Sequence, residues 1–130
     1  MMWFKKTRPP EIWEEPIAEP IGDIEAAHRI REICRAAADS AEKVGKPEGQ
    51  SPRKLQIERD RYERAAKAVM EIAMKISDEL VRDSAVREIV DLCMKANNMK
   101  TARALFRAIH AGAIKGEVLK EHPTLADEPE

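Results

Sequence analysis

The fold is decided by residues 53–111, which read RKLQIERDRYERAAKAVMEIAMKISDELVRDSAVREIVDLCMKANNMKTARALFRAIHA. All eight prolines and all five glycines of the chain lie outside this stretch. Within it, apolar residues recur at steps of three and four, as on one face of a helix, and no alternating β-branched or aromatic run is present. Because proline and glycine are the strongest breakers of helices, the sequence predicts an all-α protein.

Local signals divide the chain into about four helices. Asp23 is a good N-cap for a first helix that Gly45 ends, and Ser51-Pro52 pairs a capping hydroxyl with a ring preset to helical φ. A break is expected between 77 and 84, where Ser77-Asp78 and Asp83-Ser84 are alternative caps. The Asn97-Asn98 pair is typical of a turn. The expected helices span about 23–44, 52–76, 84–96 and 99–111, with a short helical turn around 114–121.

The first 22 residues have a different composition, with four prolines that favour extended backbone and three of the five aromatic residues. Aromatic side chains bury a large area per ordered residue. We therefore expect Trp3, Phe4 and Trp13 to contact a groove on this protein, on a second copy or on a partner, with disorder of the arm or a membrane surface as the remaining alternatives. The expected organisation is an extended Pro-rich arm over 1–22, a helical domain over 23–121 and an acidic tail over 122–130.

Composition excludes several classes of protein. The chain has 130 residues, the size of one domain, and a formal net charge of −1. No run approaches the roughly 18 apolar residues that a membrane span needs, and no secretory signal is expected. Cys34 and Cys93 fall on apolar helical stripes and are expected to be reduced thiols in the core. This cysteine usage favours a cytoplasmic location.

No pattern in the sequence is typical of an active site. A Gly-rich phosphate loop, a nucleophile elbow and a His-Glu zinc helix are all missing. The carboxylates at helical spacing each have a basic partner one turn away, whereas acid–base catalysis needs a perturbed pKa. His122 follows Glu121, but no other ligand stands at helical spacing from them. We expect no metal, no cofactor and no enzymatic activity.

Basic residues gather on one face of the helix expected over 99–111: Lys100, Arg103, Arg107 and His110. Such a face suits phosphate, an acidic peptide or an anionic membrane surface. The alternative is that these cations favour the helix dipole and solubility. The isoelectric point of about 6.3 argues against a dedicated nucleic-acid binder, and the near absence of Asn and Gln from this helix argues against reading of bases.

Residues 83–116 resemble a single tetratricopeptide-type helical hairpin. The likeness rests on Val86, Ile89, Val90 and Cys93 in the first helix and on Ala102, Phe106 and Ile109 in the second. A generic antiparallel helix pair is the alternative interpretation of the same residues. Tetratricopeptide repeats stack into a superhelix whose concave face binds peptides, so the resemblance implies that Arg87, Asp91 and Met94 face a groove.

Together these patterns predict a non-enzymatic protein that binds another macromolecule, such as an adaptor, an inhibitor or an assembly factor. The expected contact surfaces are the aromatic arm and preformed helix faces, and the first expected partner is a protein, including a second copy of the chain. The alternative is a nucleic-acid-associated regulator that uses the basic face of the helix over 99–111. A phosphate-binding surface should lose affinity steeply with salt, whereas a hydrophobic arm contact should not.

Overall fold

In the computed structural model, which describes residues 10–126, all regular secondary structure is helical. The α-helices are α1 (Asp23–Gly45), α2 (Pro52–Ala73), α3 (Glu79–Lys95), α4 (Met99–Ala108) and α5 (Gly112–Glu121), and the 3₁₀ turns are η1 (Ile12–Glu14) and η2 (Pro123–Ala126). The all-α prediction is confirmed. Between residues 10 and 126, five α-helices take the place of the four expected, because the turn predicted around 114–121 is a complete helix. No helix within residues 10–126 has the length and apolarity to cross a membrane.

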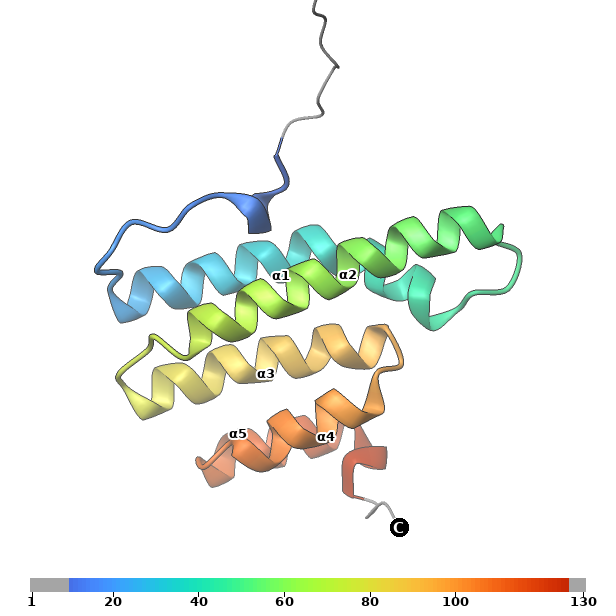
Figure 1. Ribbon diagram of the computed structural model, residues 1–130. Helices are drawn as coiled ribbons and strands as arrows, with labels where there is room; N and C mark the ends of the chain where they lie inside the picture. Colours follow the sequence, from blue (N-terminus) through green and yellow to red (C-terminus); the bar gives the residue numbers. More distant parts are fainter. Residues whose placement is uncertain (1–9, 127–130) are drawn as a thin grey trace, which may run out of the picture.

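Helix α3 occupies the centre of the fold. It contacts α1, α2, α4 and α5, and Figure 1 shows it between the α1–α2 pair and the α4–α5 pair. Its buried residues therefore lie on several sides of the helix and include Ala85, Ile89, Leu92 and Cys93. A helix surrounded in this way buries more of its circumference than the single stripe of a surface helix.

The helix boundaries differ from the sequence expectation at α3. Helix α2 ends at Ala73, and Asp78 caps α3 by accepting a hydrogen bond from the Val81 N–H at 2.9 Å. Of the two alternative caps, Ser77-Asp78 is therefore the correct one, and the expected start at 84 is wrong. Asp83 lies inside α3, where its side chain is fully buried.

The N-cap expected at Asp23 is also displaced by one residue. Gly22 is the N-cap of α1, and Asp23 turns its carboxylate to the α2–α3 loop. Its two oxygens accept hydrogen bonds from the backbone N–H groups of Ser77 and Asp78, at 2.9 and 2.8 Å. These two donors hold the pKa of the Asp23 carboxyl below its ordinary value. Asp23 thus ties the start of α1 to the start of α3.

This contact predicts a pH-dependent contribution to stability. Because the folded-state pKa of Asp23 is lowered, its contribution is fully present above the unfolded pKa of about 3.9 and is lost as the pH falls through the folded pKa. The Asp23→Asn variant should be less stable than wild type at pH 7, and the difference should shrink toward pH 2. Urea unfolding across this range measures it.

Glu25→Gln is the matched control for this experiment. Glu25 shares the first turn of α1, and therefore the favourable helix-dipole environment, but is an exposed residue away from the α2–α3 loop. If both variants show the same pH dependence, the dipole explains the effect and the proposed role of the Ser77 and Asp78 contacts is refuted.

Residues 10–22 pack along α1 and α2, with η1 in contact with both helices. Trp13 is only 8% exposed, and the Arg61 guanidinium lies 5.1 Å from the centre of its ring. Arg29 on α1 donates hydrogen bonds to the carbonyl oxygens of Ile12 and Glu15, at 3.4 and 2.8 Å. In this single chain, Trp13 therefore packs against α1 and α2.

Candidate functional site

An apolar groove runs between α2, α3 and α4. Its volume is about 290 Å³, and Arg82 is the one charged residue among those that line it. The walls come from three helices: Met70 and Ala73 from α2, with its C-cap Met74, Val86 and Ile89 from α3, and Leu105 and Ala108 from α4. The spacing of three and four residues on each helix places these side chains on one face. A ligand with apolar side chains can therefore be accommodated here.

Met74 gives the groove an open apolar edge. It follows the last residue of α2, and 84% of it is exposed, the largest fraction among the exposed large apolar residues. Methionine is flexible and polarizable, which suits it to binding surfaces that adapt to their ligand. Exposed apolar residues around a groove often mark a site of interaction.

Helix α4 carries cations with no acidic partner. Lys100 and Arg107 are exposed, and neither their side chains nor that of Arg103 form an ion pair or hydrogen bond with another residue within 10–126. The Arg103 Nε is buried without an acceptor. At 3.6 residues per turn, Lys100, Arg103 and Arg107 lie roughly 140–160° around α4 from the groove residue Leu105, so the basic face and the groove are on opposite sides of this helix. Lys100 and Arg107 are thus exposed for an anionic ligand on a surface separate from the groove.

His110, the fourth residue of that predicted face, is engaged within the chain. Its Nδ1 contacts the Glu79 carboxylate, and its backbone N–H donates to Asp83 Oδ2 at 2.9 Å. The Ala111 N–H donates to the same oxygen, also at 2.9 Å. Ala111 is the N-cap of α5, so the buried Asp83 carboxylate fixes the junction between α4 and α5.

The face of α3 implied by the tetratricopeptide resemblance is covered by α5. Arg87 forms ion pairs with Glu117 and Glu121 of α5, and Asp91 Oδ1 lies 2.7 Å from the Nε2 of His122. Met94 is half-buried and packs against the core. These three residues therefore contact neighbouring parts of the chain in the place where the resemblance implies an open concave surface.

The aromatic residues predicted to contact a partner have different outcomes. Trp13 is buried against α1 and α2, as described above, so its ring is enclosed by this chain. Trp3 and Phe4 lie outside the described residues. The sequence singled out none of the groove's α2 residues as a binding surface, although the spacing of Met70 and Met74 by four residues was a signal for one.

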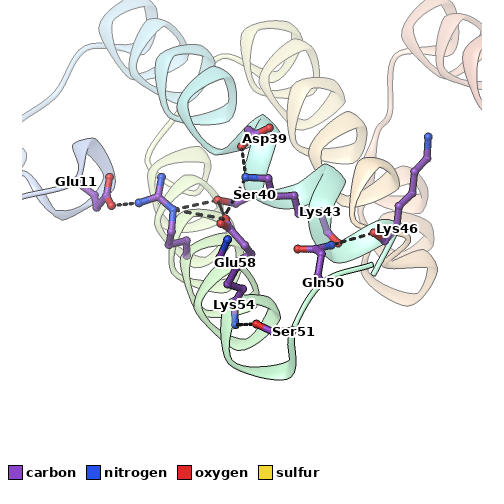
Figure 2. Close-up of polar contacts among 10 residues, drawn as sticks. Glu11, Asp39, Ser40, Lys43, Lys46, Gln50, Ser51, Lys54 and Glu58 are labelled. Carbon is purple, nitrogen blue, oxygen red and sulfur yellow. Dashed lines mark hydrogen bonds and ion pairs between the residues drawn. The ribbon is translucent and has the colours of Figure 1, made fainter. Parts of the chain in front are cut away.

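A polar cluster joins α1, α2 and the segment before η1 (Figure 2). The Ser40 hydroxyl donates to Glu58 Oε1 at 2.6 Å and accepts from Arg61 Nε at 3.0 Å, and Arg61 also pairs with Glu11. A serine bonded to a carboxylate is a combination found in nucleophilic catalysis. Ser40, however, is only 2% exposed, which closes it to a substrate. The cluster therefore holds α1, α2 and Glu11 together.

Neither cysteine has the character of a reactive thiol. Both are free and buried. Burial raises the pKa of the Cys34 thiol to about 12 and also raises the pKa of Cys93. Since the thiolate is the form that attacks electrophiles and binds metals, both side chains act as small apolar groups of the core.

Comparison with known proteins adds no further constraint on the site. No protein-family model, no curated protein and no solved structure matches this chain. The resemblance of residues 83–116 to a tetratricopeptide hairpin therefore stays a prediction.

Proposed function

We propose that this protein binds a protein partner by accepting an amphipathic helix in the groove between α2, α3 and α4. The observation that carries the proposal is the apolar lining of the groove together with the exposure of Met74. Helices bind such grooves through apolar side chains repeated at steps of three, four and seven residues. Binding of a helix involves no chemical reaction, so the proposal agrees with the prediction of a non-enzymatic protein. The predicted cytoplasmic location is kept as part of the proposal.

Apolar contact, and not charge, recognises the partner in this groove. Arg82, the one charged residue of the lining, already forms ion pairs with Glu79 and Asp83, at 3.4 and 3.7 Å. The cations of α4 lie on the opposite side of that helix from Leu105. The groove therefore selects a helix by the apolar stripe that the helix presents.

Two designed peptides test the proposal by fluorescence anisotropy. They share a polar face and carry either leucine or serine at steps of three and four residues on the opposite face. The leucine peptide should bind more tightly than the serine peptide, because only leucine buries apolar area in the groove. Met74→Glu should weaken binding of the leucine peptide at least tenfold, because this substitution places a charge at the apolar edge. Ile24→Glu, at an apolar residue of α1 that is 75% exposed, is the matched control and should leave affinity unchanged.

Two results would refute this function. One is failure of the leucine peptide to bind, and the other is an equal effect of Met74→Glu and Ile24→Glu.

A duplex DNA probe separates the alternative function, in which Lys100, Arg103 and Arg107 contact phosphates. DNA binding that falls steeply with salt and is indifferent to Met74→Glu would replace the protein partner by a nucleic acid. Self-association lost in Met74→Glu would assign the groove to a second copy.

A further inference from the structure

We propose that Asp91, Glu121 and His122 form a binding site for a Zn²⁺ ion, which links α3 to the end of α5. One ligand atom from each residue lies within 4.8 Å of the others. Asp91 comes from α3, Glu121 is the last residue of α5 and His122 is its C-cap. The site is separate from the groove and rests on different residues, so it does not depend on the proposed function.

The ligand set matches the preferences of zinc. Imidazole nitrogen and carboxylate oxygen bind Zn²⁺ at about 2.0–2.2 Å in a tetrahedral arrangement, whereas Mg²⁺ and Ca²⁺ prefer oxygen alone. The Asp91 Oδ1 and His122 Nε2 atoms are 2.7 Å apart, and tetrahedral ligands of zinc stand roughly 3.4 Å apart at these bond lengths. Binding therefore requires that these two side chains separate by less than about 1 Å and that Glu121 turns toward them. Water completes the coordination.

Arg87 is the competing cation, and its surroundings allow it to be displaced from Glu121. Its guanidinium contacts both Glu117 and Glu121. If Glu121 turns to a metal ion, Arg87 keeps Glu117 as a partner and is not left as an unpaired charge. Glu117 and Glu121 are the two carboxylates that contact this one guanidinium. With Asp91 as the third carboxylate of the cluster, negative charge exceeds the single positive charge of Arg87, which favours a divalent cation.

The proposed ligands are partly buried, so that their side chains are held in place while the site stays open to an ion from solvent. The side chains of His122 and Asp91 are 21% and 33% exposed, and the side chain of Glu121 is 45% exposed. The first two are held by packing at the α3–α5 contact, while Glu121 leaves a path for the ion. Zinc takes the lone pair of an imidazole nitrogen, which in this arrangement is the Nε2 atom of His122.

ZnCl₂ titrated into the full chain, followed by calorimetry and thermal unfolding at pH 7.5, tests the site. Wild type should bind one ion per chain, and its Tm should rise because the ion binds only the folded arrangement. Asp91→Asn and His122→Ala should each reduce affinity at least tenfold. Asp91→Asn retains a side-chain oxygen that can accept a hydrogen bond from His122. This variant should therefore stay folded and report zinc affinity even if His122→Ala unfolds.

His28→Ala is the matched control. His28 and Glu32 form an exposed His–carboxylate pair on α1 at 3.2 Å, without a third ligand within the described residues. This variant should bind zinc as wild type does. Absence of zinc binding to wild type overturns the proposal. An equal loss in the His28 and His122 variants, or no loss in Asp91→Asn, shows an adventitious ion only and also overturns it.

Discussion

Asp83→Ala is expected to lower the free energy of unfolding by about 3 kcal/mol, because it removes a buried acceptor that serves two backbone donors. The Asp83 side chain is fully buried, and its Oδ2 receives the N–H groups of His110 and Ala111. Without the carboxylate both donors stay in a part-buried site without an acceptor, and a cavity replaces the side chain. The expected fall in Tm is roughly 10 °C for a chain of this size.

Thermal unfolding and amide hydrogen exchange measure this effect. Exchange of the His110 and Ala111 amides should become faster, because the α4–α5 junction loses its anchor. Asp83→Asn should lose less stability, since its amide oxygen still accepts while the charge is gone. Asp60→Ala removes an exposed carboxylate paired with Arg64 at 3.2 Å and should cost less than about 1 kcal/mol. Equal losses in the Asp83→Ala and Asp60→Ala variants would contradict the anchoring role.

Gly45→Ala is expected to destabilise the protein by about 2 kcal/mol, although alanine is the better helix former. A Cβ atom at Gly45 would lie 2.1 Å from the carbonyl oxygen of Lys95, closer than real Cβ contacts come. The clash is with backbone, so relief requires that the ends of α1 and α3 move apart. Because α1 and α3 pack along much of their length, this movement disturbs the centre of the fold.

Gly116→Ala is the control that isolates this clash. Gly116 lies inside α5, and a Cβ atom built there meets nothing within 4 Å. The same substitution should therefore stabilise by about 0.5–1 kcal/mol through helix propensity. Urea unfolding of both variants gives the two changes with opposite signs. A stabilising Gly45→Ala would show that the close approach of α1 to Lys95 is not required.

The sequence predicted the helices well and the candidate site only in part. The absence of Pro and Gly from residues 53–111 indicated an all-α fold, and Ser51-Pro52 identified the start of α2. Lys100 and Arg107 were recognised as a basic face and are exposed on α4. The groove was not predicted, because the stripes of α2, α3 and α4 that line it were each interpreted as core.

The residues at helix ends show why the sequence signals were incomplete. Asp is a residue type typical of a helix start, and Gly is typical of a helix end. Helix α1 indeed begins at Asp23 and ends at Gly45. Their principal contacts are elsewhere: Asp23 binds the α2–α3 loop, and Gly45 allows α1 to approach Lys95. The same residue type serves both purposes, and a local pattern does not distinguish them.

By itself, the sequence determined where helices form, because helical hydrogen bonds join residues four apart and the apolar stripe repeats over the same short distance. Only the tertiary structure decided which helix faces meet. The contact of Asp83 with His110 spans 27 residues of sequence, and that of Asp91 with His122 spans 31. Such contacts depend on the angles and positions at which α3 crosses α4 and α5. Side-chain packing between the helices sets these crossings, and the spacing of residues along the sequence does not encode them. The groove and the proposed zinc site both arise from those crossings.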